Sequence, residues 1–101
     1  MKASEFIKKY GVDAAMDLWC GAFDLYNNDL QILNGMVCSF SNNQFLFELV
    51  DLKRLIDSHE LINSLGGIEK AKSYAIDANA CGAFDDENKV KQAILDVESC
   101  Q

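Results

Sequence analysis

The chain has 101 residues, of which 50% are hydrophobic and 25% charged, a composition typical of one globular domain and unlike that of a disordered chain. Nine basic against sixteen acidic residues give a net charge of −7, which argues against direct binding to nucleic acid. No apolar run approaches the ~18 residues of a membrane helix, and no apolar segment follows the N-terminal lysines as in a secretory signal. We therefore expect one small domain over residues 1–101, located in the cytoplasm and without a membrane partner.

The N-terminal part predicts two helices joined at a glycine. Ser4 is placed to cap the first helix, and Gly11 to end it. The expected inward residues of this helix are Phe6, Ile7 and Tyr10. The second helix extends to Gly21, and Asp13 and Asp17 fall outside its apolar stripe and should face water. That expected stripe consists of Val12, Ala15, Met16 and Trp19.

The middle of the chain predicts a small antiparallel meander. Asn34 and Gly35 lie between two short apolar segments, as in a hairpin with a type I′ turn. Residues 41–44 are polar and form the second turn before a third strand. The expected inner face consists of Met36, Cys38, Phe40, Phe45, Phe47 and Leu49. A sheet this small must pack against helices to be stable.

Three further helices are predicted after the meander. The first begins with Asp51 as its N-cap and ends at Gly66-Gly67, with an inward face formed by Leu52, Leu55, Ile56, His59 and Ile62. The next starts at Ile68, and the last spans Asp86 to Ser99. Their expected inward residues are Ala71, Ala75, Ala78, Val90, Ile94 and Val97. The predicted fold class is therefore α+β, with two helices, the meander and three helices; an all-helical domain is the alternative, because residues 45–65 also fit one long helix.

An internal repeat accompanies this helix pattern. The five residues Cys20–Asp24 recur unchanged as Cys81–Asp85, and each copy follows a helix–glycine–helix segment. We interpret the pattern as a duplicated helical corner, in which glycine lets two helices turn and pack together. The alternative is chance combined with a shared way of ending helices. Neither interpretation implies an activity.

No arrangement of residues predicts catalysis, a metal site or a cofactor. The four cysteines lack the close spacing of zinc ligands, and we expect them to be reduced, with Cys100 the most exposed. The one histidine, His59, lies on the apolar stripe of its helix, where a packed histidine is commoner than a general base. The chain is therefore predicted not to be an enzyme; a small thiol or acid–base hydrolase is the alternative.

The distribution of charge predicts a binding surface. No basic residue occurs between Lys9 and Lys53, or from Ser73 to Asn88. Such stretches attract a protein with a basic surface, although a plain solvated surface is the alternative interpretation. Exposed aromatic residues nearby would serve as anchors. The candidate partner-binding residues are Asp13, Asp17, Asp24, Asp29, Asp85, Asp86 and Glu87.

The helix from Leu52 to Ile62, followed by Leu65–Lys72, resembles small accessory proteins from the early regions of lambdoid phages and enterobacterial prophages. Phe6–Gly11 and Lys91–Ser99 resemble the two ends of these proteins. The resemblance implies a phage gene expressed inside a bacterium, whose product modifies the host or blocks its defences by binding a protein. The hypothesis is therefore an anti-CRISPR-like inhibitor or modulator of a nucleic-acid-handling host or defence protein. A homodimeric assembly module is the alternative from a different class.

Overall fold

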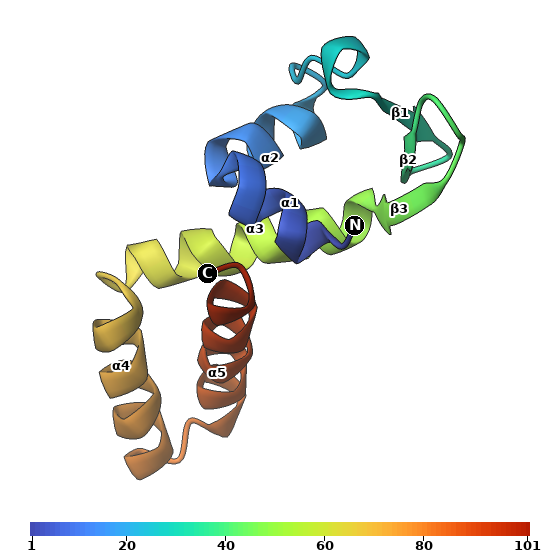
Figure 1. The fold of residues 1–101 in the computed structure, drawn as a ribbon. Coiled ribbons are helices and arrows are strands. Elements are labelled where there is room, and N and C mark those ends of the chain that lie inside the picture. Colours follow the sequence, from blue (N-terminus) through green and yellow to red (C-terminus); the bar gives the residue numbers. More distant parts are fainter. The chain divides into compact units, whose positions relative to one another are not determined.

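The computed structural model describes residues 1–101, and its contacts divide the chain into two compact units, residues 1–56 and 57–101 (Figure 1). The elements are α1 (Ala3–Tyr10), α2 (Val12–Cys20), a 3-10 turn η1 (Tyr26–Asn28), β1 (Leu30–Leu33), β2 (Met36–Ser39), β3 (Phe45–Glu48), α3 (Leu49–Ser64), α4 (Ile68–Ala80) and α5 (Phe84–Ser99). This order confirms the α+β class and the sequence of helices, meander and helices. No helix of the chain is long and apolar enough to cross a membrane.

Two helical corners, one in each unit, have the same backbone geometry. Gly11 and Gly67 both have positive φ, +94° and +111°, with extended ψ, and each is the N-cap of the following helix. The carbonyl of Gly11 accepts a bond from the Ala15 N–H at 3.1 Å, and that of Gly67 from the Ala71 N–H at 2.9 Å. Because side chains disfavour positive φ, glycine is the residue suited to both corners.

The repeated pentapeptide ends both preceding helices in the same way. Gly21 and Gly82 adopt left-handed φ values of +84° and +79°. In each copy the next N–H reaches back to the fifth residue before it: Ala22 to the Asp17 carbonyl and Ala83 to the Ala78 carbonyl, both at 2.8 Å. These are Schellman motifs, which satisfy carbonyls left open at a helix end.

After the motif the two copies diverge. Phe23 is half-buried, and its ring lies 5.4 Å from that of Phe6 and 5.6 Å from that of Tyr10. Phe84 begins α5 instead and is 59% exposed. The identical residues therefore specify the helix end but not the path that follows it.

The hairpin turn is confirmed, but the predicted inner face of the sheet is largely wrong. Asn34 and Gly35 both have positive φ, as a type I′ turn requires. The register pairs Val37 with Phe47, and these two residues form the buried face. Of the residues expected to face inward, Met36, Phe40 and Phe45 are exposed, Leu49 begins α3, and Phe47 and Cys38 are buried.

Contact with α1 determines which face of the sheet is buried. The Phe6 ring, fully buried, lies 5.7 Å from the ring of Phe47. Side chains of a strand alternate between its two faces, so fixing Phe47 inward also fixes its partner Val37 and directs Met36 outward. A bulge between Val37 and Cys38 breaks the alternation and leaves Cys38 buried as well.

Four details of the helices also differ from the predictions. Ser4 lies within α1, whose N-cap is Lys2, so Ser4 does not cap the helix. In α2 the buried residues are Ala15 and Leu18, while Trp19, expected inside, is 40% exposed. Helix α3 begins at Leu49, before the expected N-cap. Helix α5 begins at Phe84, two residues before the predicted start at Asp86.

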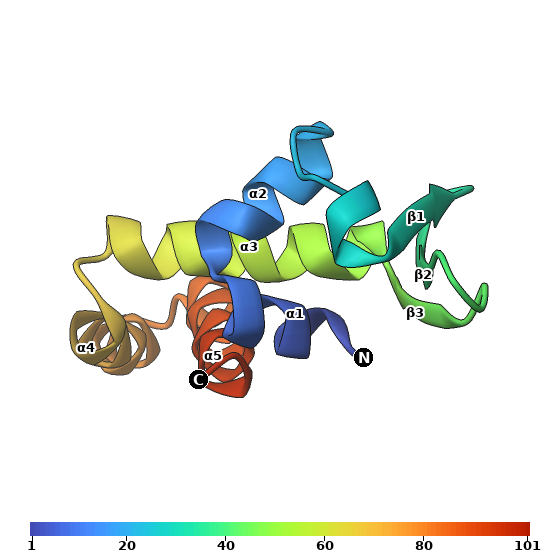
Figure 2. The same cartoon turned by 45° about the horizontal axis from the view of Figure 1, so that its top comes forward.

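The second unit is built on close packing of α4 against α5, which lie side by side in both views (Figures 1 and 2). Ala71 and Ala75 present only methyl groups to the partner helix. The predicted inward residues of both helices are confirmed as buried, and the core cluster consists of Ile62, Ala71, Ala75, Val90, Ala93, Ile94 and Val97. One polar contact supports it: the Ser58 hydroxyl donates to Asp96 Oδ2 at 2.7 Å, with both side chains buried.

Substitution of Ala71 tests this packing. Ala71 is fully buried, so Ala71→Leu must push α4 and α5 apart and should lower the free energy of unfolding by about 1–3 kcal/mol. Ala80→Leu, at an exposed position of the same helix, should change it by less than about 0.5 kcal/mol. Urea unfolding followed by circular dichroism measures both; equal effects would contradict the close packing.

Candidate functional site

Two of the predicted acids lie free on the surface of the first unit. Asp13 and Asp17 are one helical turn apart on α2, and both are exposed as predicted. Residues four apart on a helix project from the same side, so the two carboxylates share one face of α2. Trp19 is exposed on the same helix, and the Lys53 ammonium lies 5.9 Å from the centre of its ring.

Asp24 and Asp29 are exposed too, but they bond within the chain. The Asp24 carboxylate accepts bonds from the Asn27 backbone N–H at 3.1 Å and from its side-chain amide at 2.6 Å. These bonds fix the start of η1, much as a capping residue fixes the start of a helix. Asp24 is therefore a structural residue as well as a surface charge.

Asp29 holds the end of η1 against the turn between β2 and β3. Its carboxylate accepts bonds from the Ser41 N–H at 2.8 Å and from the hydroxyls of Ser41 and Ser39, both at 2.9 Å. Its carbonyl accepts a bond from the Phe40 N–H at 3.0 Å. Hydrogen bonds from Ser41 and then from Ser39 stabilise the ionised form and lower the pKa of Asp29.

The Asp29 contacts position two exposed aromatic rings. Tyr26, on η1, is 81% exposed, and Phe40, at the end of β2, is 57% exposed. Their centroids lie 6.5 Å apart in an edge-to-face arrangement. Sequence reasoning missed this pair because it placed Phe40 in the core. Two exposed rings that contact each other, in a segment of the chain that also carries the exposed acids Asp24 and Asp29, are suited to binding a cationic side chain.

In the second unit the three predicted acids differ in their exposure to solvent. Asp85 and Asp86 are exposed in the first turn of α5, where negative charge suits the helix dipole. Glu87, predicted as a surface acid, is 6% exposed, which corrects that prediction. Its Oε1 accepts a bond from the Lys91 ammonium at 2.7 Å, and Lys91 followed by Asn79 lowers the pKa of Glu87.

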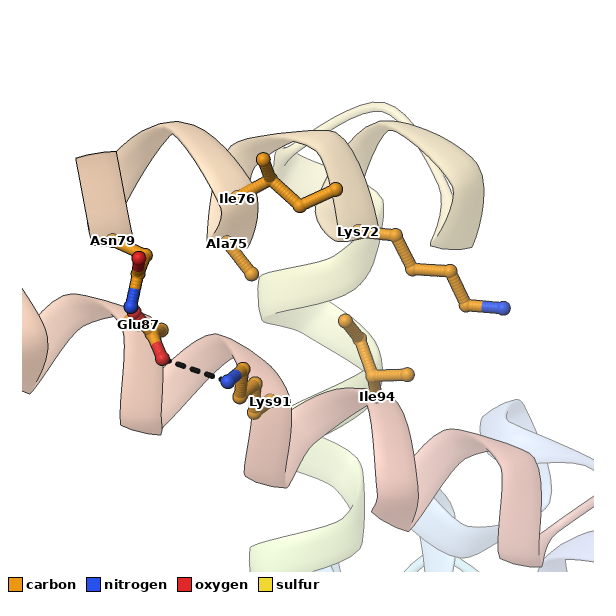
Figure 3. Close-up of a pocket in the computed structure, with 7 residues that line it drawn as sticks. All are labelled: Lys72, Ala75, Ile76, Asn79, Glu87, Lys91 and Ile94. Atoms are coloured by element: carbon orange, nitrogen blue, oxygen red, sulfur yellow. Dashed lines mark hydrogen bonds and ion pairs between the residues drawn. The ribbon is translucent and has the colours of Figure 1, made fainter.

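Glu87 lies beside a groove between α4 and α5, where the side chains of Lys91 and Asn79 cover its carboxylate (Figure 3). The groove has a volume of about 470 Å³. The residues lining it are Lys72, Ala75, Ile76, Asn79, Glu87, Lys91 and Ile94. No sequence motif pointed to it; the only signal was the run of alanines on α4, which allows the two helix backbones to approach.

The four cysteines divide between the surface and the interior of the protein. Cys20 and Cys81 are exposed, whereas Cys38 and Cys100 are buried, so the prediction that Cys100 is the most exposed is wrong. Burial raises the pKa of the Cys100 thiol. His59 is half-buried on α3. No group of three or more histidine, cysteine or acidic side chains is arranged to hold a metal ion.

Comparison of the chain with protein-family models, with curated proteins and with solved structures gives no match.

The Asp29 contacts make stability depend on pH. Folding lowers the pKa of Asp29, so its contribution is complete above the ordinary carboxyl pKa and is lost as pH falls through the lower folded value. Asp29→Asn, which keeps the backbone preference but not the charge, should lower stability at neutral pH and flatten its acid dependence. Asp13→Asn is the matched control and should keep the wild-type dependence. Thermal melts between neutral and acid pH measure both; identical curves for wild type and D29N would contradict this role.

Thiol reactivity checks the positions of the cysteines. Cys20 and Cys81 should react quickly with Ellman's reagent in the folded protein, while Cys38 and Cys100 should react only after unfolding. The double variant C20S/C81S should then show no fast phase. A fast phase that survives in this variant would mean that a thiol placed in the interior is accessible.

Proposed function

We propose that this chain is a protein-binding module that engages a basic partner through an acidic and aromatic surface of its first unit. The residues that we propose to contact the partner, here called the acidic–aromatic surface, are the exposed acids Asp13 and Asp17 of α2 and the exposed rings of Tyr26 and Phe40. The observation that carries the proposal is the exposed pair of Tyr26 and Phe40, held by the Asp29 contacts in a stretch without basic residues.

The pair combines the two properties of a good interface anchor. Aromatic side chains bring a large contact area at a small cost in side-chain entropy, and they dominate many measured interfaces. Because the backbone beside Phe40 is already fixed by Asp29, little further ordering is needed when a partner binds. Nearby carboxylates add long-range attraction for a positively charged partner and speed the encounter.

The biological setting of the proposal comes from the resemblance to accessory proteins of lambdoid phages. In that setting the chain acts in a bacterial cell as an inhibitor or modulator of a host or defence protein that handles nucleic acid. Such proteins expose basic grooves for phosphate backbones. A net charge of −7 is spread over both units, so we propose local competition at one edge of such a groove and not imitation of a whole duplex.

Self-association is the second candidate function. It is favoured by further exposed apolar side chains in the same unit, among them Leu33 and Met36, which pair across β1 and β2, and Val50. Exposed apolar area of this kind often marks an interface between copies. Sedimentation at micromolar concentration separates the two candidates, because a monomer that captures a host protein excludes the assembly role.

Charge reversal tests the acidic–aromatic surface. Asp13→Lys/Asp17→Lys should abolish salt-sensitive capture of a basic protein from bacterial lysate and leave the fold intact, since neither carboxylate takes part in an ion pair. Asp24 and Asp29 are kept, because their substitution would disturb η1. Glu69→Lys/Asp77→Lys, two exposed acids of α4, is the matched control with the same change in net charge.

Truncation of Tyr26 measures the contribution of the aromatic ring to binding separately from that of the charges. Tyr26→Ala should weaken binding of the captured protein by about 2 kcal/mol, roughly thirty-fold, as at other interface hot spots. Tyr74→Ala, an exposed tyrosine of α4, is the control. The proposal is wrong if the reversed and control variants bind alike and Tyr26→Ala binds as wild type.

A further inference from the structure

The sheet of the first unit carries almost no charge. Residues 30–47, which form all of the sheet except the last residue of β3, contain no acidic or basic side chain, although 25% of the whole chain is charged. This is the longest uncharged run in a chain of net charge −7. Helices α2, α4 and α5 all expose carboxylates, so two copies that met through them would bring like charges together. At the sheet two copies can meet without that repulsion.

Strand β1 forms one edge of this sheet, and its outer side is unpaired (Figures 1 and 2). The Phe40 N–H donates to the Asp29 carbonyl at 3.0 Å, and hydrogen-bonded pairs alternate along antiparallel strands. By this alternation Leu33 and Met36, which close the hairpin, form a bonded pair as well. Ile32, the residue before Leu33, therefore directs its N–H and its carbonyl away from β2, and neither group bonds to another segment of the chain.

Strand β1 has none of the features that usually protect an edge strand. Natural edges are protected by a charged side chain, a proline or a bulge. The sequence of β1 is Leu-Gln-Ile-Leu, and it pairs with β2 in an unbroken register. The other edge strand, β3, carries Glu48 and pairs with β2 through a bulge. Leu33 and Met36, exposed by 48% and 37%, lie at the hairpin end of β1, so its edge combines free backbone groups with apolar side chains.

We infer that β1 pairs antiparallel with β1 of a second copy of the chain, so that two sheets join into one sheet of six strands. Such an edge is complementary to itself, because a two-fold axis places the two Ile32 residues opposite each other and each offers one donor and one acceptor. In this register Leu33 lies opposite Gln31 of the second copy and diagonal to its Leu33, within reach of a side-chain contact. The inference rests on the self-association candidate and gives it a defined interface.

Sedimentation equilibrium of the whole chain measures the dimer. A contact of a few paired residues is small for a specific interface, so we expect a dissociation constant of about 10 µM. Both copies carry net negative charge but the contact does not, so added salt should tighten the dimer.

Two pairs of variants test the contact. Ile32→Pro removes the outward N–H and should weaken the dimer roughly tenfold or more, whereas Ile32→Ala keeps the N–H and should still dimerise. Leu33→Lys brings like charges together across the two-fold axis and should have a similar effect to Ile32→Pro. Its control is Phe45→Lys, a comparably exposed residue of β3 with the same change in net charge.

Amide hydrogen exchange locates the contact. The Ile32 amide should exchange quickly in dilute protein and become protected as the dimer forms, while the Leu33 amide, bonded to Met36, should be protected at both concentrations. A chain that is still monomeric at about 100 µM overturns both the self-association candidate and this inference. A dimer that Ile32→Pro and Leu33→Lys leave intact, or an Ile32 amide whose exchange is independent of concentration, overturns this interface alone. Protection of Ile32 that appears only with the captured host protein assigns the edge to a strand of that partner and also overturns the inference.

Discussion

Glycine conformation is the constraint on which the rest of the structure depends. The chain has no proline, and helices α1 to α4 each end at or just before a glycine with positive φ. Gly11 and Gly67 turn the backbone between helices, and Gly21 and Gly82 close helices through Schellman motifs. Because these turns are short, successive helices are brought into contact, and a chain of this length buries two small cores.

Close packing of neighbouring elements also shapes both candidate surfaces. In the first unit Asp29 joins η1 to the turn after β2, and the exposed rings of Tyr26 and Phe40 follow from that connection. In the second unit, alanines draw α4 close to α5, and the larger side chains of Ile76 and Lys91 then line a groove beside the contact. Each surface is a consequence of packing that the fold requires.

Local signals in the sequence predicted the elements well, because helix ends and tight turns are decided by nearby residues. The Asn34-Gly35 hairpin is an example. The buried face of the sheet was not predictable, since alternation leaves two faces equivalent until Phe6 packs on Phe47. The site residues show the same limit: the exposure of Asp13 follows from helix periodicity, whereas the burial of Glu87 depends on a second helix.

The pairing of neighbours along the chain has a kinetic consequence. Strand β2 pairs with the strands before and after it, α1 contacts α2, and α4 contacts α5. Such contacts close short loops, for which the entropic cost is small, and proteins rich in them fold within microseconds to milliseconds. Without proline, the unfolded chain has no slow prolyl isomerisation to wait for. Newly made chains should therefore reach the native state soon after synthesis.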